Sequence, residues 1–322
     1  MSVVEVRDLR RVYRSATGTV RRRVKTTVAV GGISFEIAEG ELFGLLGPNG
    51  AGKTTTIKIL TTLLLPTSGE ARVLGHDVAR EAKQVRGKIG YVFGGERGLY
   101  DRLSGLDNLS YFADIYRVPA REKRGRIREL LELVGLSGRE RERVETYSRG
   151  MRQRLHIARG LLHDPPVLFL DEPTLGLDPV GARDLRAMIR QLASSGKTVL
   201  LTTHYMFEAD ELCDRIAVIA EGAIVAEGSP STLKHHVADR HVLEIEVFGA
   251  DESVVDRLRT VEGVESVVSE DRDQSQLLVV HSSRGAELVE VLLRELHGTR
   301  VGRVVSREPT LEDAYVELVN RA

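Results

Sequence analysis

A glycine-rich loop that directly follows a short apolar run constrains the fold of this chain more than any other feature. The run Glu41–Leu46 reads ELFGLL, and the next nine residues read GPNGAGKTT. A continuous apolar run of this length is typical of a parallel strand buried on both faces. A helix is expected to begin near Gly52 and to continue to about Leu64, where Pro66 ends it. The order strand, glycine loop, helix predicts an α/β nucleotide-binding unit.

The loop fits the phosphate-binding pattern G-x-x-x-x-G-K-[ST]. Backbone amides that no helical carbonyl can satisfy converge there, and the helix dipole adds a favourable field for anions. Lys53 is expected to place its charge on the β- and γ-phosphates, and the Thr54 hydroxyl is expected to ligate Mg²⁺. We therefore expect ATP to be bound by Gly47, Pro48, Asn49, Gly50, Ala51, Gly52, Lys53, Thr54 and Thr55.

Two adjacent carboxylates follow a second buried strand. The run VLFL ends in Asp171-Glu172, and the carboxyl ends of parallel strands meet at one edge of a sheet. We expect Asp171 to face the metal ion and Glu172 to face the attacking water. The alternative is that an acid merely terminates a buried strand.

The remaining pattern predicts an α/β core with an insertion. Apolar and charged residues alternate over Val3–Leu9 and Ile33–Ile37, which predicts strands with one solvent-exposed face. The basic segment Arg14–Thr27 between them, with Arg21, Arg22, Arg23 and Lys25, is interpreted as a solvated loop, or as a contact for lipid headgroups or a partner. Further strands are predicted over 88–93, 167–170, 198–202 and 215–220, with an arginine-rich helical segment over 107–162.

The composition changes after the segment Glu227–Pro230. We expect an ATP-binding domain over 1–228, with an antiparallel β subdomain and a helical subdomain at about 95–162. We expect a C-terminal α+β domain over 229–322, whose order βαββαβ suggests a ferredoxin-like fold.

Overall composition excludes several classes of function. The 322 residues are 42% hydrophobic and carry a net charge of −1, so no global field draws the chain to nucleic acid. The single cysteine, Cys213, lies in an apolar stretch where a buried, inert thiol is expected. The sequence contains no run of eighteen apolar residues, so we expect a cytosolic, non-spanning chain.

Over residues 1–228 the chain resembles the nucleotide-binding subunits of ABC transporters. Besides the two motifs above, Tyr147–Met151 (YSRGM) occupies the place of the family signature LSGGQ, and Leu175–Asp178 matches the D-loop. His204, in LLTTH, matches the switch histidine. Tyr13 lies where the family stacks an aromatic ring on adenine, and we expect it to contact the nucleotide; the alternative is a tyrosine that merely ends a strand.

The resemblance implies a head-to-tail dimer, formed with a second copy or with a similar subunit, that encloses two ATP molecules. Each ATP would lie between one phosphate loop and the other subunit's signature, where Ser148 and Gly150 begin a helix. Asp178 is counted among the nucleotide-binding residues. The resemblance also implies a peripheral position at the cytoplasmic face of a membrane, docked on a multi-spanning permease. The expected catalytic residues are Lys53, Glu172 and His204.

The sequence departs from the family pattern at two places. Arg149 replaces the first glycine of the signature, as in exporter branches with [LY]-S-[KR]-G-M. The glutamine expected at 94 or 95 is absent, and the chain has Gly94-Gly95-Glu96. Glu96 either supplies a hard oxygen ligand to Mg²⁺ or faces solvent while water completes the metal shell.

The C-terminal segment Glu308–Tyr315 (EPTLEDAY) is similar to the P-[ST]-L-E-D motif of drug and antibiotic export ATPases. We therefore expect an exporter whose C-terminal domain serves assembly or regulation. One alternative is an importer ATPase, which shares every catalytic motif. The other is a soluble ABC ATPase that acts on ribosomes or DNA, a class that typically has two cassettes or long coiled coils.

Overall fold

The computed structural model describes residues 1–17, 23–93, 98–235, 241–272, 274–282 and 288–320. The chain divides into two compact units, Met1–Pro230 and Ser231–Arg321. No helix in these described ranges is both long and apolar enough to cross a lipid bilayer.

The first unit is built on a six-stranded sheet with the order β10-β9-β3-β8-β7-β6. All neighbours are parallel except β10, which pairs antiparallel with β9. Every residue of β3, β7 and β8 is buried, as continuous apolar runs require. The strands are β3 Leu42–Leu46, β6 Ile89–Val92, β7 Val167–Asp171, β8 Thr198–Thr203, β9 Arg215–Ala220 and β10 Ala223–Gly228.

A second, antiparallel sheet has the order β2-β1-β4-β5. It shares one hydrophobic core with the six-stranded sheet, in which the rings of Phe35 and Phe43 stack with centroids 5.3 Å apart. The expected α/β fold with an added antiparallel sheet is confirmed. The strands are β1 Ser2–Thr17, β2 Arg23–Ala38, β4 Ser68–Val73 and β5 His76–Asp77.

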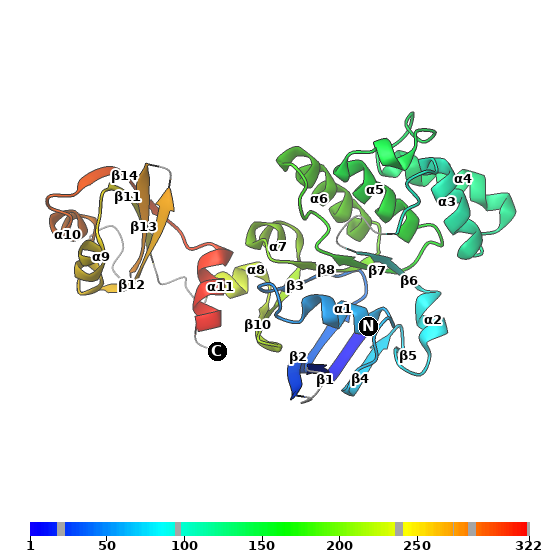
Figure 1. Ribbon diagram of the computed structural model, residues 1–322, viewed down its shortest axis with the longest axis horizontal. Helices are drawn as coiled ribbons and strands as arrows, with labels where there is room; N and C mark the ends of the chain where they lie inside the picture. Colours follow the sequence, from blue (N-terminus) through cyan, green and yellow to red (C-terminus); the bar gives the residue numbers. More distant parts are fainter. Residues whose placement is uncertain (18–22, 94–97, 236–240, 273, 283–287, 321–322) are drawn as a thin grey trace. The chain divides into compact units, whose positions relative to one another are not determined.

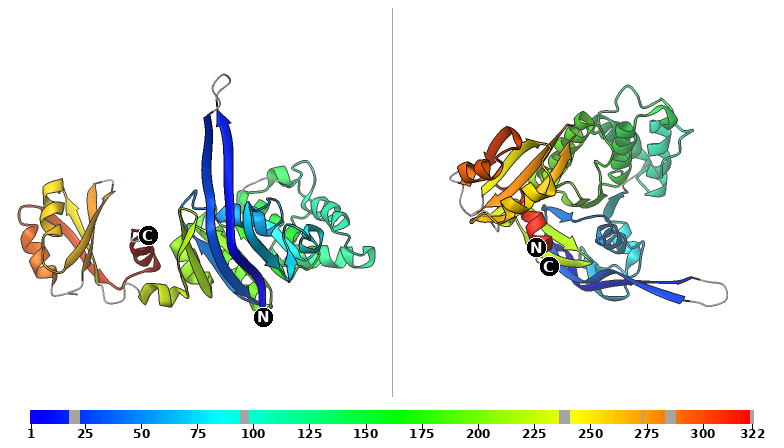
Figure 2. Two further views of the ribbon diagram at one scale, coloured as in Figure 1. Left: turned by 90° about the horizontal axis from the view of Figure 1, so that it is seen from below. Right: turned by 60° about the vertical axis from the view of Figure 1, so that its left-hand side comes forward.

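The interpretation of Arg14–Thr27 as a loop is wrong. Strands β1 and β2 continue through this segment in register, with Tyr13 opposite Thr27 and Thr17 opposite Arg23. Figure 2 shows the resulting hairpin extending beyond the rest of the sheet. Valines and threonines favour the strand conformation, and a hairpin that leaves the core can carry charges along its length. Arg21 and Arg22 lie outside the described residues.

Helix α1, Lys53–Leu60, is shorter than the expected helix to Leu64. Thr62 has φ 64°, and this left-handed residue terminates the helix before Pro66 can do so. The amide of Leu63 then donates to the carbonyl of Lys58 (2.8 Å).

The helical subdomain is inserted between β6 and β7, which pair parallel. Figure 1 shows its helices grouped at one side of the first unit. Ser104 caps α3 by accepting from the amide of Asp107. These helices are α3 Gly105–Ile115, α4 Ala120–Leu133 and α5 Arg149–Gly160, with a 3₁₀ turn at Val144–Thr146; the others of this unit are α2 Ala82–Arg86, α6 Pro179–Ser194 and α7 Met206–Leu212.

The second unit has its own antiparallel sheet, with the order β12-β13-β11-β14. Helices α9 and α10 pack on one face of it, against alternate residues of β11: Leu243, Ile245 and Val247. The elements are β11 His241–Phe248, α9 Glu252–Arg259, β12 Val264–Arg272, β13 Ser275–Ser282, α10 Leu288–Glu295, β14 Arg300–Arg307 and α11 Leu311–Asn320, preceded by the short helix α8 Pro230–His235.

The segment Glu308–Tyr315 forms the polar start of α11. Asp313 accepts from the amide and the hydroxyl of Thr310, both at 2.7 Å, so the two residues form a capping box. The guanidinium of Arg307 bonds Asp313 (2.6 Å) and Glu244 on β11 (2.6 Å). Burial alone would raise the pKa of Asp313, but the bonds from Arg307 and Thr310 outweigh it and lower the pKa. This motif therefore ties α11 to the sheet.

We predict that Asp313→Asn destabilises the second unit by about 3 kcal/mol, because it removes one of the two carboxylates that pair with the partly buried guanidinium of Arg307. Since the folded-state pKa of Asp313 lies below the unfolded one, its stabilisation is complete at neutral pH and is lost as the pH falls through the folded pKa, below about 3.9. Denaturant unfolding at several pH values measures both effects. The exposed pair Arg259–Asp256 provides the control, and Asp256→Asn should change stability little. Equal stability of the Asp313 and Asp256 variants at pH 7 would contradict the tethering role.

Candidate active site

Residues 47–55 run from the end of β3 into the first turn of α1, and two glycines of this segment have no room for a side chain. A Cβ on Gly47 would lie 2.2 Å from the carbonyl oxygen of Ile219 on β9. Gly52 has φ 111°, and a Cβ there would lie 2.4 Å from the carbonyl oxygen of Ala29 on β2. We call residues 47–55 the phosphate loop. Their backbone is thus fixed between the two sheets, with the N-terminus of α1 behind it.

Lys53, the first residue of α1, reaches back over the phosphate loop. Its Nζ donates to the carbonyls of Gly47 (2.6 Å) and Pro48 (3.1 Å) and lies 3.6 Å from Oε1 of Glu172. Only 4% of the side chain is exposed. Burial lowers the pKa of Lys53, although Glu172 and Asp171 oppose that effect. A buried ammonium with few anionic partners is suited to receive the negative charge of a phosphate.

Asp171, at the end of β7, is the most constrained acid of the site. Thr202 on the neighbouring strand β8 donates to its Oδ1 (2.7 Å), and Thr54 on α1 donates to the same oxygen (3.2 Å). Burial raises the pKa of Asp171, and these two hydroxyl bonds only partly offset the effect. A cation beside Asp171 and Thr54 would favour the ionised carboxylate.

Glu172 adopts the left-handed conformation, with φ 47°. Its amide donates to both the carbonyl and the hydroxyl oxygen of Thr202, each at 3.1 Å. Oε2 lies 3.3 Å from Nδ1 of His204, an ion-pair distance without hydrogen-bond alignment. A strained conformation persists only where the surroundings hold it, and here it directs the Glu172 carboxylate between Lys53 and His204.

Comparison with known proteins agrees with this geometry. Residues 30–175 match the family model "ABC transporter". The chain is 41% identical over 293 residues to the daunorubicin resistance ATP-binding protein DrrA3 of Streptomyces coeruleorubidus, covering 90% of each chain. This chain belongs to the ABC transporter ATP-binding proteins. The family expected from the motifs is thereby confirmed, and the chain is an ATPase.

A second relative and a solved structure agree with this family. It is 35% identical over 294 residues to the linearmycin resistance ATP-binding protein LnrL of Bacillus subtilis, covering 91% of this chain and 94% of the relative. A solved structure, the dimeric ATP-binding cassette MJ0796 in a post-hydrolysis state bound to ADP and Pi, is 27% identical with a TM-score of 0.62. That match covers 70% of this chain and 98% of the solved chain. ATP binding by this domain is therefore established.

Tyr13 lies on β1, which pairs with the strand that contacts the phosphate loop, β2. Tyr13 pairs with Thr27 on β2, two residues before Ala29, which contacts the Gly52 position. The guanidinium of Arg11 lies 4.8 Å from the centre of the Tyr13 ring, which is 38% exposed. The adenine-stacking role of Tyr13 stays a prediction.

The signature and D-loop residues lie on other elements than the phosphate loop. Ser148 caps α5 by accepting from the amide of Met151 (3.3 Å), and Gly150 lies in the first turn. Asp178 caps α6, and bonds from the amides of Gly181 and Val180 lower its pKa. Within the described ranges, no hydrogen bond or ion pair joins these residues to the phosphate loop. Gly94, Gly95 and Glu96 lie outside the described residues.

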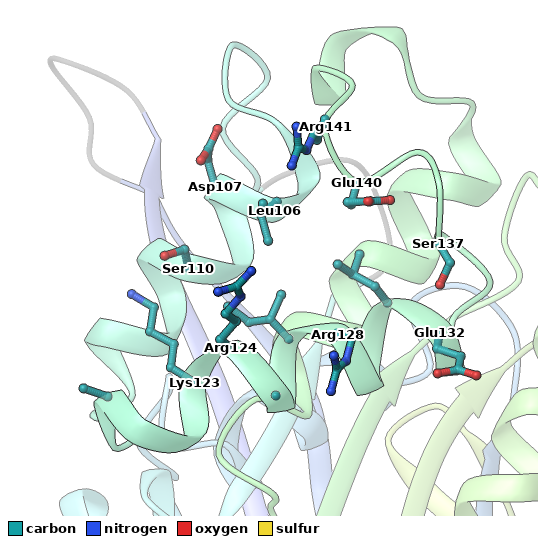
Figure 3. Close-up of a pocket in the computed structure, with 14 residues that line it drawn as sticks. Leu106, Asp107, Ser110, Lys123, Arg124, Arg128, Glu132, Ser137, Glu140 and Arg141 are labelled. Carbon is teal, nitrogen blue, oxygen red and sulfur yellow. The ribbon is translucent and has the colours of Figure 1, made fainter.

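A separate hollow of about 1100 Å³ lies in the helical subdomain, between α3 and α4. Figure 3 shows the basic side chains of Arg124 and Arg128 and the acidic side chain of Glu140 around it. Its lining includes none of the predicted catalytic residues. The hollow is therefore distinct from the nucleotide site.

Sequence reasoning missed Thr202, whose hydroxyl donates to the carboxylate of Asp171 and accepts from the amide of Glu172. The available signal was a threonine at the end of a fully apolar run, immediately before Thr203 and His204. Parallel pairing of β7 and β8 places Asp171 directly opposite Thr202. A buried hydroxyl needs a partner, and the carboxylate of Asp171 supplies it.

We predict that Thr202→Val lowers kcat for ATP about tenfold, as loss of a supporting hydrogen bond to a metal ligand typically does. The variant keeps the shape of the side chain but leaves Asp171 and the amide of Glu172 each short of a partner. Steady-state kinetics of the purified chain measures the effect. Thr198→Val is the matched control, because Thr198 is equally buried on β8 but bonds the distant amide of Gly40. An unchanged kcat in Thr202→Val would contradict the supporting role.

Proposed function

We propose that this chain drives export through a separately encoded, multi-spanning membrane subunit, by binding and hydrolysing ATP at the carboxyl edge of its six-stranded sheet. The convergence of Lys53, the pair Thr54–Asp171 and the pair Glu172–His204 at this edge carries the proposal. The chain would lie peripherally at the cytoplasmic face of the membrane.

The residues at the edge fit a bound Mg²⁺. Thr54 and Asp171 offer hard oxygen atoms 3.2 Å apart. Among the described residues there is no group of three or more histidine, cysteine or acidic side chains that could hold a metal ion. This donor set suits a cation that takes its other ligands from phosphate oxygens and water, as Mg²⁺ commonly does. When bound, Mg²⁺ would neutralise charge on the β- and γ-phosphates.

Each catalytic side chain has a distinct part in hydrolysis. Glu172 orients the attacking water and accepts its proton, because its carboxylate lies at this edge of the sheet between Lys53 and His204. His204 holds the γ-phosphate and, at 3.3 Å, keeps the Glu172 carboxylate in place. Lys53 stabilises the charge that develops on the transferred phosphoryl group.

The nucleotide site is completed by a second subunit, either another copy or a similar chain. Two helix N-termini suited to anions, those of α1 and α5, belong to separate parts of the chain. The solved relative MJ0796 is a dimer with bound ADP and Pi. We infer that Ser148 and Gly150 of one subunit close the γ-phosphate site of the other, and that Asp178 lies at the same interface.

We predict that Glu172→Gln binds ATP, does not hydrolyse it, and accumulates as a dimer, because the amide keeps the shape of the side chain but cannot accept the proton. Size-exclusion chromatography with and without ATP measures the assembly. Lys53→Ala is the matched control, since it loses the phosphate contact and should remain monomeric with ATP. A Glu172→Gln chain that stays monomeric with saturating ATP, or that turns ATP over, would argue against the proposed site.

The second unit supports export rather than chemistry. We propose that residues 229–322 form a ferredoxin-like domain, on the basis of its antiparallel order β12-β13-β11-β14. The relatives that match over nearly the whole chain, this unit included, are named for daunorubicin resistance, linearmycin resistance and Nod factor export. An importer ATPase, or a soluble ATPase acting on ribosomes or DNA, is less consistent with these matches. The path of the transported molecule would lie in the membrane subunit.

Exposed apolar side chains around α3 are proposed to receive the membrane subunit. Tyr100, Tyr111 and Ile115 are 48%, 44% and 53% exposed. The rings of Tyr100 and Tyr111 meet edge to face, with centroids 5.1 Å apart, and Tyr100 also stacks on Phe112. Clustered exposed aromatics mark protein contact sites.

We predict that Ile115→Asp abolishes co-purification with the membrane subunit, because it places a charge in the apolar contact, while the ATPase activity of the isolated chain is unchanged. Detergent extraction of membranes followed by affinity capture measures the association. Val268→Asp is the control, since Val268 is similarly exposed on β12. Equal recovery of the membrane subunit with both variants would exclude α3 from the contact.

A further inference from the structure

The residue that departs from the family signature contacts the D-loop of the same chain. A Cβ built on Gly176 would lie 1.9 Å from Nη1 and 2.3 Å from Cζ of Arg149. The Arg149 guanidinium therefore occupies the space where any residue other than glycine at 176 would place its side chain. Gly176 also has φ 71°, a conformation that glycine adopts without strain.

The next residues of both segments also lie close together. A Cβ built on Gly150 would lie 4.0 Å from Cδ2 of Leu177, within van der Waals reach. Two consecutive signature residues, Arg149 and Gly150, thus lie against two consecutive D-loop residues. The turn itself is closed by bonds from the amides of Leu175 and Leu177 to the carbonyls of Glu172 and Thr174.

The two helices that begin at these segments are joined further along. Arg154 on α5 pairs with Asp184 on α6 (3.0 Å), and Figure 1 shows the two helices next to each other. Within the described part of the chain, Arg149 makes no ion pair or hydrogen bond. Its contact with Gly176 is therefore one of packing, and a side chain at 176 would have to displace the guanidinium.

We propose that Arg149 is a positioning residue that locks the D-loop turn, Leu175–Leu177, to the N-terminus of α5, so that both segments meet the second subunit as one rigid surface. The inference rests on the proposed ATP-dependent dimer. In that dimer α5 closes the partner's γ-phosphate site, and the turn directly follows the catalytic Glu172. An error in the relative position of α5 and the turn would then misplace either the phosphate contact or the subunit contact.

A double-mutant cycle in the Glu172→Gln background tests the proposal. ATP-driven dimerisation is measured by analytical ultracentrifugation for the parent chain, Arg149→Ala, Gly176→Ala and the double variant. The backbone strain of alanine at 176 is the same in both backgrounds and cancels. We expect Gly176→Ala to weaken dimerisation about tenfold more when Arg149 is present than when it is absent. A coupling of about threefold or more supports the proposal, and a smaller coupling overturns it.

The matched control uses Arg152, which lies on the same helix but pairs with Asp101 (2.7 Å) and not with the turn. Arg152→Ala and Gly176→Ala should be additive, and monomer ATP affinity should be unchanged in all these variants. If the Glu172→Gln chain stays monomeric with ATP, the proposed dimer has failed. In that case the inference is tested by the hydrogen-exchange rate of the Leu177 backbone amide, compared between the wild-type monomer and Arg149→Ala. Faster exchange in Arg149→Ala supports the lock, and unchanged exchange overturns it.

Discussion

A buried carboxylate at the end of β7 is the constraint around which the active site is arranged. Asp171 would be costly to bury without hydrogen bonds, and its partners come from α1, through Thr54, and from β8, through Thr202. The same Thr202 holds the amide of Glu172. Three elements that are distant in sequence are therefore fixed together at one edge of the sheet. The phosphate loop, the acid pair and His204 owe their relative positions to this junction.

The first unit uses polar side chains near its surface to fix where helices begin. Ser104, Ser148 and Asp178 each cap a helix with their side chain. The second unit uses the same device at α11, where Thr310 and Asp313 form the cap and Arg307 connects it to β11. The motif that resembles exporter ATPases is thus explained by folding chemistry, because its threonine and aspartate are held within the unit.

Features that depend only on a short stretch of sequence could be predicted. The phosphate loop, the buried strands β7, β8 and β9, and the acid pair follow from apolar runs and glycine spacing. The continuation of β1 and β2 through the basic segment was not predicted, because charge was taken as a sign of a loop although valines and threonines alternate with it. The early end of α1 depends on the left-handed conformation of Thr62, which no simple pattern predicts.

Contacts between segments that are far apart in sequence could not be predicted. The bond from Thr202 to Asp171 requires the strand order, since the two residues meet only because β8 lies beside β7. Arg149 was noticed as a departure from the family pattern, but its contact with Gly176 depends on how α5 and α6 pack. The roles of Ser148, Gly150 and Asp178 toward the nucleotide require a second subunit, which one sequence does not describe.

The central claim is that each ATP is hydrolysed between the phosphate loop of one subunit and the signature of the other. Mixing two inactive variants, Lys53→Ala and Gly150→Asp, tests it most directly. A Cβ at 150 has its nearest neighbours at 4.0 Å, so the aspartate can be accommodated while its charge opposes the phosphate. In a mixed head-to-tail dimer one site combines an intact phosphate loop with an intact signature, so mixing should restore ATPase activity to at most about half of the wild-type level. A mixture as inactive as its two components would contradict the account.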